Sequence, residues 1–227
     1  SLFGIAIFNS LLYTATQTTT ALNCALIQSL MPAAIILCSF LLGRERIDLQ
    51  QGVGVLLCSL GAVWIVLQGK LLSISSLTLV AGDLWMLVAI CSYALYSTLL
   101  PRRPKIHPLS FLTITIGLGT LMLVLPFFIE LQIKGLPTVN ISVLLGILYI
   151  ATFPSIAAYL CWNRGVEIIG ANRAGLFINL IPVFAAGMAI LFLGERLQEF
   201  HLVGILMVLG GMVMFQLSGK KGRGTGT

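Results

Sequence analysis

Charge is what this sequence has least of. Only 9% of its 227 residues are charged, whereas a soluble globular domain carries about 25%. Hydrophobic residues make up 58%, and the mean hydropathy is +1.05. This composition excludes a soluble domain and indicates an integral membrane protein that crosses the bilayer several times. The net charge of +6 is explained below by its location and is no sign of nucleic-acid binding.

The motifs of membrane-embedded enzymes are also missing. The sequence has no H-E-x-x-H, no G-x-S-x-G and no phosphate-binding loop. His107 and His201 fall in predicted turns, where we expect them to be solvated and not paired on a metal. No C-x-x-C pair occurs among the cysteines, which all fall in apolar stretches and are expected to pack there: Cys24, Cys38, Cys58, Cys91 and Cys161. We therefore expect no enzyme activity, no metal and no cofactor.

Acidic residues are missing from the middle of every apolar stretch. Asp83, Glu130 and Glu167 all lie near predicted ends. A carboxylate buried at mid-membrane for proton coupling is thus not visible in this sequence. Asp83, two residues from Trp85, is the nearest candidate.

Long apolar stretches dominate what is present. A helix needs about 20 mainly apolar residues to cross a bilayer, and lipid forces backbone groups to pair within the segment. The sequence predicts an all-α membrane protein with eight helices over residues 2–18, 21–43, 49–69, 80–100, 108–130, 139–162, 170–193 and 199–217.

Basic residues are distributed unevenly between the two predicted membrane faces. Ten of the 13 Lys and Arg residues fall on the side that holds both chain ends, and three fall opposite: Lys70, Lys134 and Arg196. Positive residues accumulate on the cytoplasmic side of membrane proteins. We therefore expect a multi-pass protein of the plasma membrane with both ends in the cytoplasm.

The chain contains an internal sequence repeat. A shift of 150 residues lays residues 21–70 over 171–220 without a gap, and 15 of the 50 positions are identical. Pro32 matches Pro182, and Glu45-Arg46 matches Glu195-Arg196. Because an odd number of predicted spans separates equivalent points, the copies should be inverted, as in alternating-access transporters.

The first copy is the shorter one. We predict an incomplete first repeat of three helices over 1–70, a linker over 71–79, a second repeat of five helices over 80–220 and a basic cytoplasmic tail over 221–227. Two helices would precede Ser1 in a complete ten-helix (5+5) protein, and we expect this sequence to be truncated at its amino end.

Polar and aromatic side chains within the apolar stretches predict where a substrate binds, because such groups are costly in lipid unless they meet each other or water. Their helical spacing places several of these side chains along one face of their helix, and the same faces also carry Gln17, Ala89, Tyr96 and Ser155. The cavity candidates are Asn9, Tyr13, Gln28, Ser29, Trp85, Tyr93, Tyr159, Asn163 and Asn179. We expect the five helices that carry them to converge on one chamber. The alternatives are hydrogen bonds that hold the bundle together and, for Trp85, Tyr96 and Trp162, an aromatic belt at the interface.

Prolines and glycines recur at equivalent places in both copies. Pro32 and Pro182 should kink their helices and free the carbonyls of Gln28 and Ile178, which suits a gate or, alternatively, a static bend. Small residues seven apart lie on one helix face and allow close helix contact. We therefore predict helix packing at Gly54, Gly61, Gly204 and Gly211.

The order and duplication of several motifs resemble the EamA-type family of the drug/metabolite transporter superfamily. The residues that carry the resemblance are Leu41–Arg46, Gly82-Asp83-Leu84-Trp85, Tyr159–Arg164 and Leu193–Leu197. The resemblance implies ten helices in two inverted repeats and export or exchange of small metabolites across the lipid bilayer, and its family-level expectation is a bacterial inner membrane.

From the cavity residues we expect a neutral or zwitterionic substrate such as an amino acid. Two alternatives stay open: a non-transporting remnant or assembly subunit, and a membrane-embedded enzyme. The substrate, the coupling ion, the direction of flux, the source organism and a homodimer are not fixed by the sequence.

Overall fold

The structure, a computed structural model, describes residues 2–43, 47–70, 80–104, 106–136, 140–194 and 196–221, and these ranges contain helices and no strand. The Glu45-Arg46 turn, Glu195 and the 71–79 linker lie outside them. The helices are η1 (Leu2–Ile7), α1 (Phe8–Thr18), α2 (Ala21–Gln28), α3 (Met31–Leu41), α4 (Leu49–Val66), α5 (Ala81–Leu99), η3 (Leu100–Arg102), α6 (Pro108–Lys134), α7 (Ile141–Ile150), η4 (Ala151–Ala157), α8 (Ala158–Ile169), α9 (Ala171–Leu176), η5 (Phe177–Leu180), α10 (Ile181–Leu193) and α11 (Glu199–Lys221).

Six helical segments of the described chain are long and apolar enough to cross a membrane, and a seventh joins them if α2 and α3, bent by 40°, form one span. The helix predicted over 2–18 is present as η1 and α1 but is not among these segments. The protein is an all-helical, multi-pass membrane protein, and the count of eight spans stays a prediction.

Local sequence signals begin and end these helices. The Thr20 side chain accepts from the backbone N–H of Asn23 and begins α2. Asp48 and Gln51 cap each other's backbone at the start of α4. Gly170 and Gly194 follow the ends of α8 and α10 with φ of 84° and 70°, a conformation that glycine adopts without the steric cost of a side chain.

The helices follow the sequence repeat closely. The starts of α1, α2, α3 and α4 lie at residues 8, 21, 31 and 49, and those of α8, α9, α10 and α11 lie 150 residues later, at 158, 171, 181 and 199. Wide π-helical turns, η1 and η4, precede α1 and α8. The similarity between the copies therefore extends upstream of residues 21–70.

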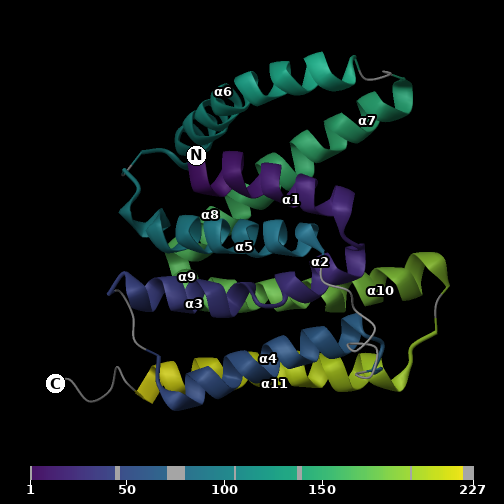
Figure 1. The fold of residues 1–227 in the computed structure, drawn as a ribbon. Helices are drawn as coiled ribbons and strands as arrows, with labels where there is room; N and C mark the ends of the chain where they lie inside the picture. The colour runs from purple at the N-terminus through teal and green to yellow at the C-terminus, as the bar shows by residue number, and fades with distance from the viewer. Residues whose placement is uncertain are drawn as a thin grey trace.

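The last helices of the two copies, α4 and α11, lie side by side (Figure 1). A Cβ added at Gly54 would lie 2.8 Å from the Gly211 carbonyl oxygen, and one at Gly61 would lie 2.8 Å from that of Gly204. The early glycine of each helix therefore faces the late glycine of the other, so the helices are antiparallel. Such reciprocal contact is what a two-fold relation between the copies produces.

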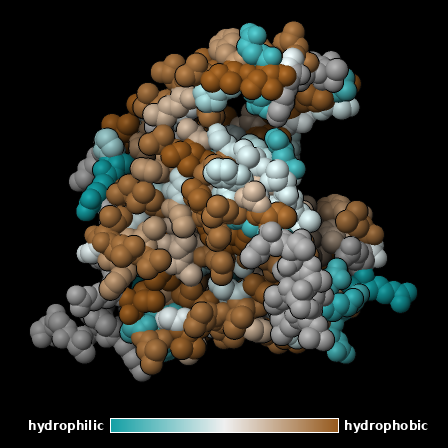
Figure 2. Space-filling model, in the orientation of Figure 1, coloured by the Kyte–Doolittle hydropathy of each residue, from teal (hydrophilic) through white to brown (hydrophobic). Residues whose placement is uncertain are grey.

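The remaining helices stack on this pair in layers. Figure 1 shows α3 and α10 above it, then α5 with α8 and α1, and finally α6 and α7, which project from the body. A buried cluster that includes Met31, Ile35, Met86 and Ile90 holds the middle layers together. Outward-facing positions carry large apolar side chains, such as Leu191 at 80% exposure, and brown hydrophobic atoms cover much of the surface in Figure 2. This surface is suited to lipid.

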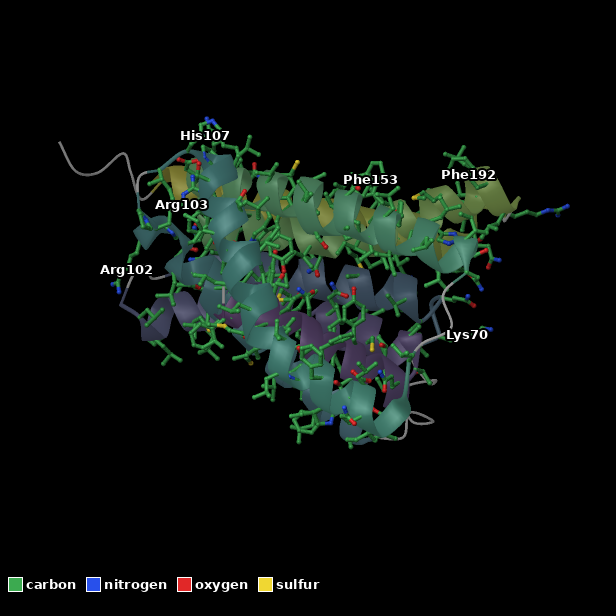
Figure 3. The ribbon with its side chains drawn as sticks, turned by 90° about the horizontal axis from the view of Figure 1, so that it is seen from above. Lys70, Arg102, Arg103, His107, Phe153 and Phe192 are labelled. Carbon is green, nitrogen blue, oxygen red and sulfur yellow. The ribbon has the colours of Figure 1, made fainter. Side chains whose placement is uncertain are left out.

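The two ends of the bundle differ in charge. Arg102, Arg103 and His107 lie at one end and Lys70 lies at the opposite end (Figure 3). The first is called the inner end and the second the outer end, after the orientation that the positive residues predict. The chain runs from inner to outer along α1 and from outer to inner along α7, η4 and α8 (Figure 1).

Candidate functional site

An aromatic cluster lies where α1, α5 and α8 meet. Tyr93 of α5 is its centre, with ring centroids 4.7 Å from Phe8, 5.7 Å from Tyr96, 6.3 Å from Tyr159 and 5.5 Å from Trp162. Tilted and edge-on ring pairs at these separations attract one another. The cluster joins a helix of the first copy to two helices of the second.

Hydrogen bonds fix most polar atoms of this cluster. The Tyr96 hydroxyl donates to Asn163 Oδ1 at 2.7 Å, Trp162 Nε1 donates to Ser97 Oγ at 3.2 Å, and the Tyr159 hydroxyl donates to the Gly4 carbonyl. Asn163 is only 2% exposed, yet its Nδ2 has no hydrogen-bond partner among the described residues. A buried donor without an acceptor is costly, so this amide is suited to an oxygen acceptor of a ligand.

One face of α1 continues from this cluster toward the outer end. Asn9 is half-buried, beside the Tyr159 hydroxyl. Tyr13 is 52% exposed, and Gln17 is also exposed. Figure 2 shows the molecule hollowed on its right side, between α7 and α10, with atoms of intermediate hydropathy in the wall. A polar helix face of this kind needs water, protein or a ligand as its neighbour.

A second polar group lies where both copies break their helices. Asn179 is 1% exposed, and its side chain lies 3.2 Å from Ser59 Oγ. The Ser59 hydroxyl donates to the Ser29 carbonyl at 2.9 Å. With its amide turned so that both ends are satisfied, Asn179 also donates to that carbonyl at 3.3 Å. Ser29 and Asn179 are repeat equivalents, so the two breaks meet through one shared serine.

The two prolines lie just after these breaks. Pro32 and Pro182 are at the starts of α3 and α10, in the first turn, where proline is tolerated. The Ile178 carbonyl, predicted to be freed by Pro182, accepts the backbone N–H of Ile181. A small cavity of about 30 Å³ lies here, lined by Ala25, Gln28, Ser29, Ile178, Asn179, Ile181 and Pro182, and this is room for one water-sized group.

The structure brings together most, but not all, of the predicted cavity residues. Tyr93, Tyr159 and Asn163 share the aromatic cluster, whereas Gln28, Ser29 and Asn179 form the second group around Ser59. These are two groups where the sequence predicted one chamber. Trp85 is 42% exposed and has no ring contact with the cluster in the described part of the chain.

Sequence reasoning missed several contributors to these groups. Phe8 and Ser59 are not among the predicted cavity residues, and Trp162 is named only in the alternative of an aromatic belt at the interface. Ser97 lies four residues after Tyr93, hence on the same helix face, and this spacing was the available signal. No sequence signal identified Ser59, because it reaches the site only through the packing of α4 on α2 and η5.

Two other titratable groups are more buried than their places in the sequence suggest. The prediction that His201 is solvated is wrong: it is 6% exposed, and its Nδ1 accepts the backbone N–H of Gln198 at 3.1 Å. Its ring lines an outer-end cavity of about 560 Å³ with Pro182 and Arg196. No group of three or more potential metal ligands from His, Cys, Asp and Glu occurs in the part of the chain that the structure describes.

Asp83 is 3% exposed at the outer end of α5. It accepts from Thr19 Oγ1 at 2.5 Å, from Asn23 Nδ2 at 3.2 Å and from the backbone N–H of Val80 at 3.0 Å. These bonds tie the turn between α1 and α2 to the start of α5. These hydrogen bonds explain a structural role for the Asp83 carboxylate. Its role in proton coupling stays a prediction.

Ion pairs join the segment that follows α5 to the inner end of α8. Arg103 lies 3.0 Å from Glu167, which also pairs with Arg164 at 2.9 Å. Arg103 stacks over the Phe111 ring at 5.3 Å. Figure 3 shows Arg103 at the inner end, far along the bundle from Lys70. Arg103 and Glu167 also line a cavity of about 440 Å³ at this end, together with Leu100 and Ile106.

Comparison with known proteins decides the family. The sequence model of the EamA-like transporter family matches residues 1–67 and 80–217. The chain belongs to the EamA-like transporter family. It is 30% identical over 214 residues to the uncharacterized transporter YyaM of Bacillus subtilis strain 168, with 93% of this chain and 70% of the relative covered. A second relative from that strain, the uncharacterized transporter YetK, is 28% identical over 228 residues, with 97% and 67% covered.

An uncharacterized transporter of Archaeoglobus fulgidus is 25% identical over 215 residues, with 94% of this EamA-like chain and 73% of the relative covered. A solved crystal structure superposes with a TM-score of 0.70 at 17% identity, covering 92% of this chain and 71% of the other, and shows that the two share a fold. The EamA-like family and its relatives support a transporter role for this membrane protein.

Proposed function

We propose that this EamA-like protein is a secondary transporter that exports or exchanges small neutral or zwitterionic metabolites, such as amino acids. The substrate binds between the two inverted repeats, and rocking of helix bundles about that site alternates access. The protein lies in the plasma membrane with both ends in the cytoplasm, because positive residues gather at the inner end.

The aromatic cluster with its unpartnered amide is the observation that carries this proposal. Tyrosine and tryptophan rings offer flat apolar faces with one polar handle each, and Asn163 Nδ2 offers a buried donor. No acidic or basic side chain is among the residues that form the cluster, which favours a substrate without net charge. Figure 2 shows a hollow on the side of the molecule where the outer end of α1 lies.

A flux measurement tests the proposal. The purified protein is reconstituted into liposomes that are loaded with a mixture of unlabelled amino acids, and uptake of radiolabelled amino acids by exchange is followed. We expect saturable exchange of at least one of them. Tyr93→Ala removes the centre of the cluster, and Asn179→Leu removes the amide between the helix breaks. Each should lower the exchange rate by about 10-fold or more, the cost of about one lost binding contact or more.

Tyr149→Ala is the matched control, because Tyr149 is 60% exposed on α7 and lies outside the cluster. It should leave exchange unchanged. The thermal stability of each variant is measured in parallel to separate lost binding from lost folding. Unchanged exchange in both well-folded Tyr93→Ala and Asn179→Leu would show that the cavity is misplaced.

A further inference from the structure

The inner-end cavity beside Arg103 and Glu167 belongs to neither of the polar groups described above. Its volume is about 440 Å³, and its walls are Leu100, Pro101, Arg103, Pro104, Ile106 and Glu167. These residues lie in the segment that follows α5 and at the end of α8, both in the second copy. The walls are therefore formed without any residue of the first copy.

The size and the lining of this cavity suit an amphiphilic occupant. Sites for small molecules have volumes of about 300–1,000 Å³, whereas one water occupies about 30 Å³ in the liquid. Four of the lining residues are apolar, and the other two form an ion pair. Pro101 and Pro104 have a fixed φ, and the backbone N–H of Arg103 donates to the Leu100 carbonyl at 3.0 Å. The wall is thus preformed, which lowers the entropic cost of binding.

Positive charge exceeds negative charge around the cavity. Arg103 Nη2 lies 3.0 Å from Glu167 Oε2, and Arg164 Nη1 lies 2.9 Å from the same oxygen. One carboxylate oxygen thus serves two guanidinium groups. Arg102, next to Arg103 in the chain, is exposed at the same end of the bundle (Figure 3). Such an excess of positive charge favours an anionic ligand.

Arg103 is the residue placed to hold that anion. Its side chain is 12% exposed, and its guanidinium carbon lies 5.3 Å from the centroid of the Phe111 ring, so packing fixes its position. A guanidinium has five N–H donors, and even a bidentate pair with one carboxylate uses only two of them. Its planar fork also matches the oxygens of a phosphate group. Arg103 can therefore keep its bond to Glu167 and donate to a phosphate in the cavity.

We propose that this cavity binds the phosphate headgroup of an anionic phospholipid from the leaflet at the inner end of the bundle. Arg103 donates to the phosphate, and the apolar wall contacts the glycerol and the first acyl carbons. Ile106 is 40% exposed, so this wall is accessible to lipid. Basic pockets between membrane helices on the cytoplasmic side suit such headgroups. The inference is independent of the proposed transport function.

Lipid binding by the purified full chain tests the inference. Native mass spectrometry in one detergent counts bound lipids while phosphatidylglycerol or phosphatidylcholine with the same acyl chains is added. The choline group places a positive charge near the arginines, and phosphatidylglycerol does not. We therefore expect the first phosphatidylglycerol to bind about five-fold more tightly than the first phosphatidylcholine.

The two partners of the ion pair should act in opposite directions. Arg103→Gln removes the donor and should weaken phosphatidylglycerol binding by about 10-fold. Glu167→Gln removes the negative charge of the cavity wall and should strengthen binding by about two- to five-fold, a gain that misfolding cannot produce. Arg196→Gln, which removes an exposed charge at the outer end, is the matched control and should leave binding unchanged.

The outcomes separate a lipid site from a structural ion pair. Weaker binding in both Arg103→Gln and Glu167→Gln would show that the pair only braces the structure, and would overturn the proposal. Equal affinity for the two lipids, or an equal loss in Arg196→Gln, would overturn it as well. Glycerol phosphate, added as a competitor, should displace phosphatidylglycerol only at concentrations well above that of the lipid. Equal affinity for glycerol phosphate would keep the phosphate site and overturn the lipid as its source.

Discussion

The contact between α4 and α11 gives a sharp prediction, because two neighbouring glycines of α11 have opposite surroundings. A Cβ built at Gly211 would lie 2.5 Å from the Gly54 carbonyl oxygen and 2.6 Å from the Cys58 backbone nitrogen. At Gly210 the nearest atom is a Leu57 side-chain carbon at 3.9 Å, an ordinary contact. The same change, glycine to alanine, therefore tests one packing effect at adjacent positions.

The expected changes in stability differ in sign between Gly211 and Gly210. In Gly211→Ala the methyl group meets backbone, so the two helices must move apart, and overpacking of this kind costs about 1–3 kcal/mol. Alanine's higher helix propensity returns up to about 1 kcal/mol. In Gly210→Ala only the propensity term remains, so stability should hold or rise slightly. A change of 1 kcal/mol shifts the midpoint of a chain of this length by about 2–4 °C.

The assay is thermal unfolding of the purified protein in one detergent, followed by tryptophan fluorescence and by the monodisperse fraction on gel filtration. Gly211→Ala should lower the midpoint, and Gly210→Ala should not. Because Gly54 and Gly211 face each other, Gly54→Ala and Gly211→Ala should combine non-additively. Equal midpoints for the two alanine variants of α11 would refute the close approach of the helices.

Three further predictions concern polar contacts. Donation by Ser218 and by the backbone N–H of Gln51 lowers the pKa of Asp48, so its stabilising effect is present above its usual pKa of about 4 and is lost as pH falls through the lowered value. Asp48→Asn should flatten the fall of the unfolding midpoint at acidic pH. Asp83→Asn places an NH₂ group next to other hydrogen-bond donors and should lower the free energy of unfolding by about 1–3 kcal/mol. An unchanged midpoint in the same unfolding assay would show that Asp83 does not stabilise the link between α5 and the α1–α2 turn. Tyr96→Phe deletes the bond to Asn163 and should cost about 1 kcal/mol. The same unfolding assay measures this cost, and an unchanged midpoint would count against a stabilising Tyr96–Asn163 bond.

Composition and periodicity were enough to predict the class of fold. Apolar length requires helices in a bilayer, so the positions of the helices could be predicted, with errors at their ends of up to seven residues, as for the helix predicted over 139–162 that extends to Ile169. The repeat, visible at Pro32 and Pro182, was also open to sequence reasoning, because equivalent residues keep a fixed spacing whatever their contacts. The breaks at Ser29 and Asn179 and the arrangement of Gly54 against Gly211 needed coordinates, since spacing along one helix does not say which helix lies opposite.

The sequence by itself determined that this protein is a helical membrane protein with two related copies and an uneven distribution of basic residues along the chain, because hydropathy, repeat and charge are properties of the linear chain. Tertiary structure alone decided which polar residues meet. It placed Trp162 and Phe8 around Tyr93, left Trp85 outside and buried His201, because these outcomes depend on how helices distant in sequence pack. The difference in exposure between Tyr13 and Asn163 has the same origin, since these repeat equivalents have different neighbours in the bundle.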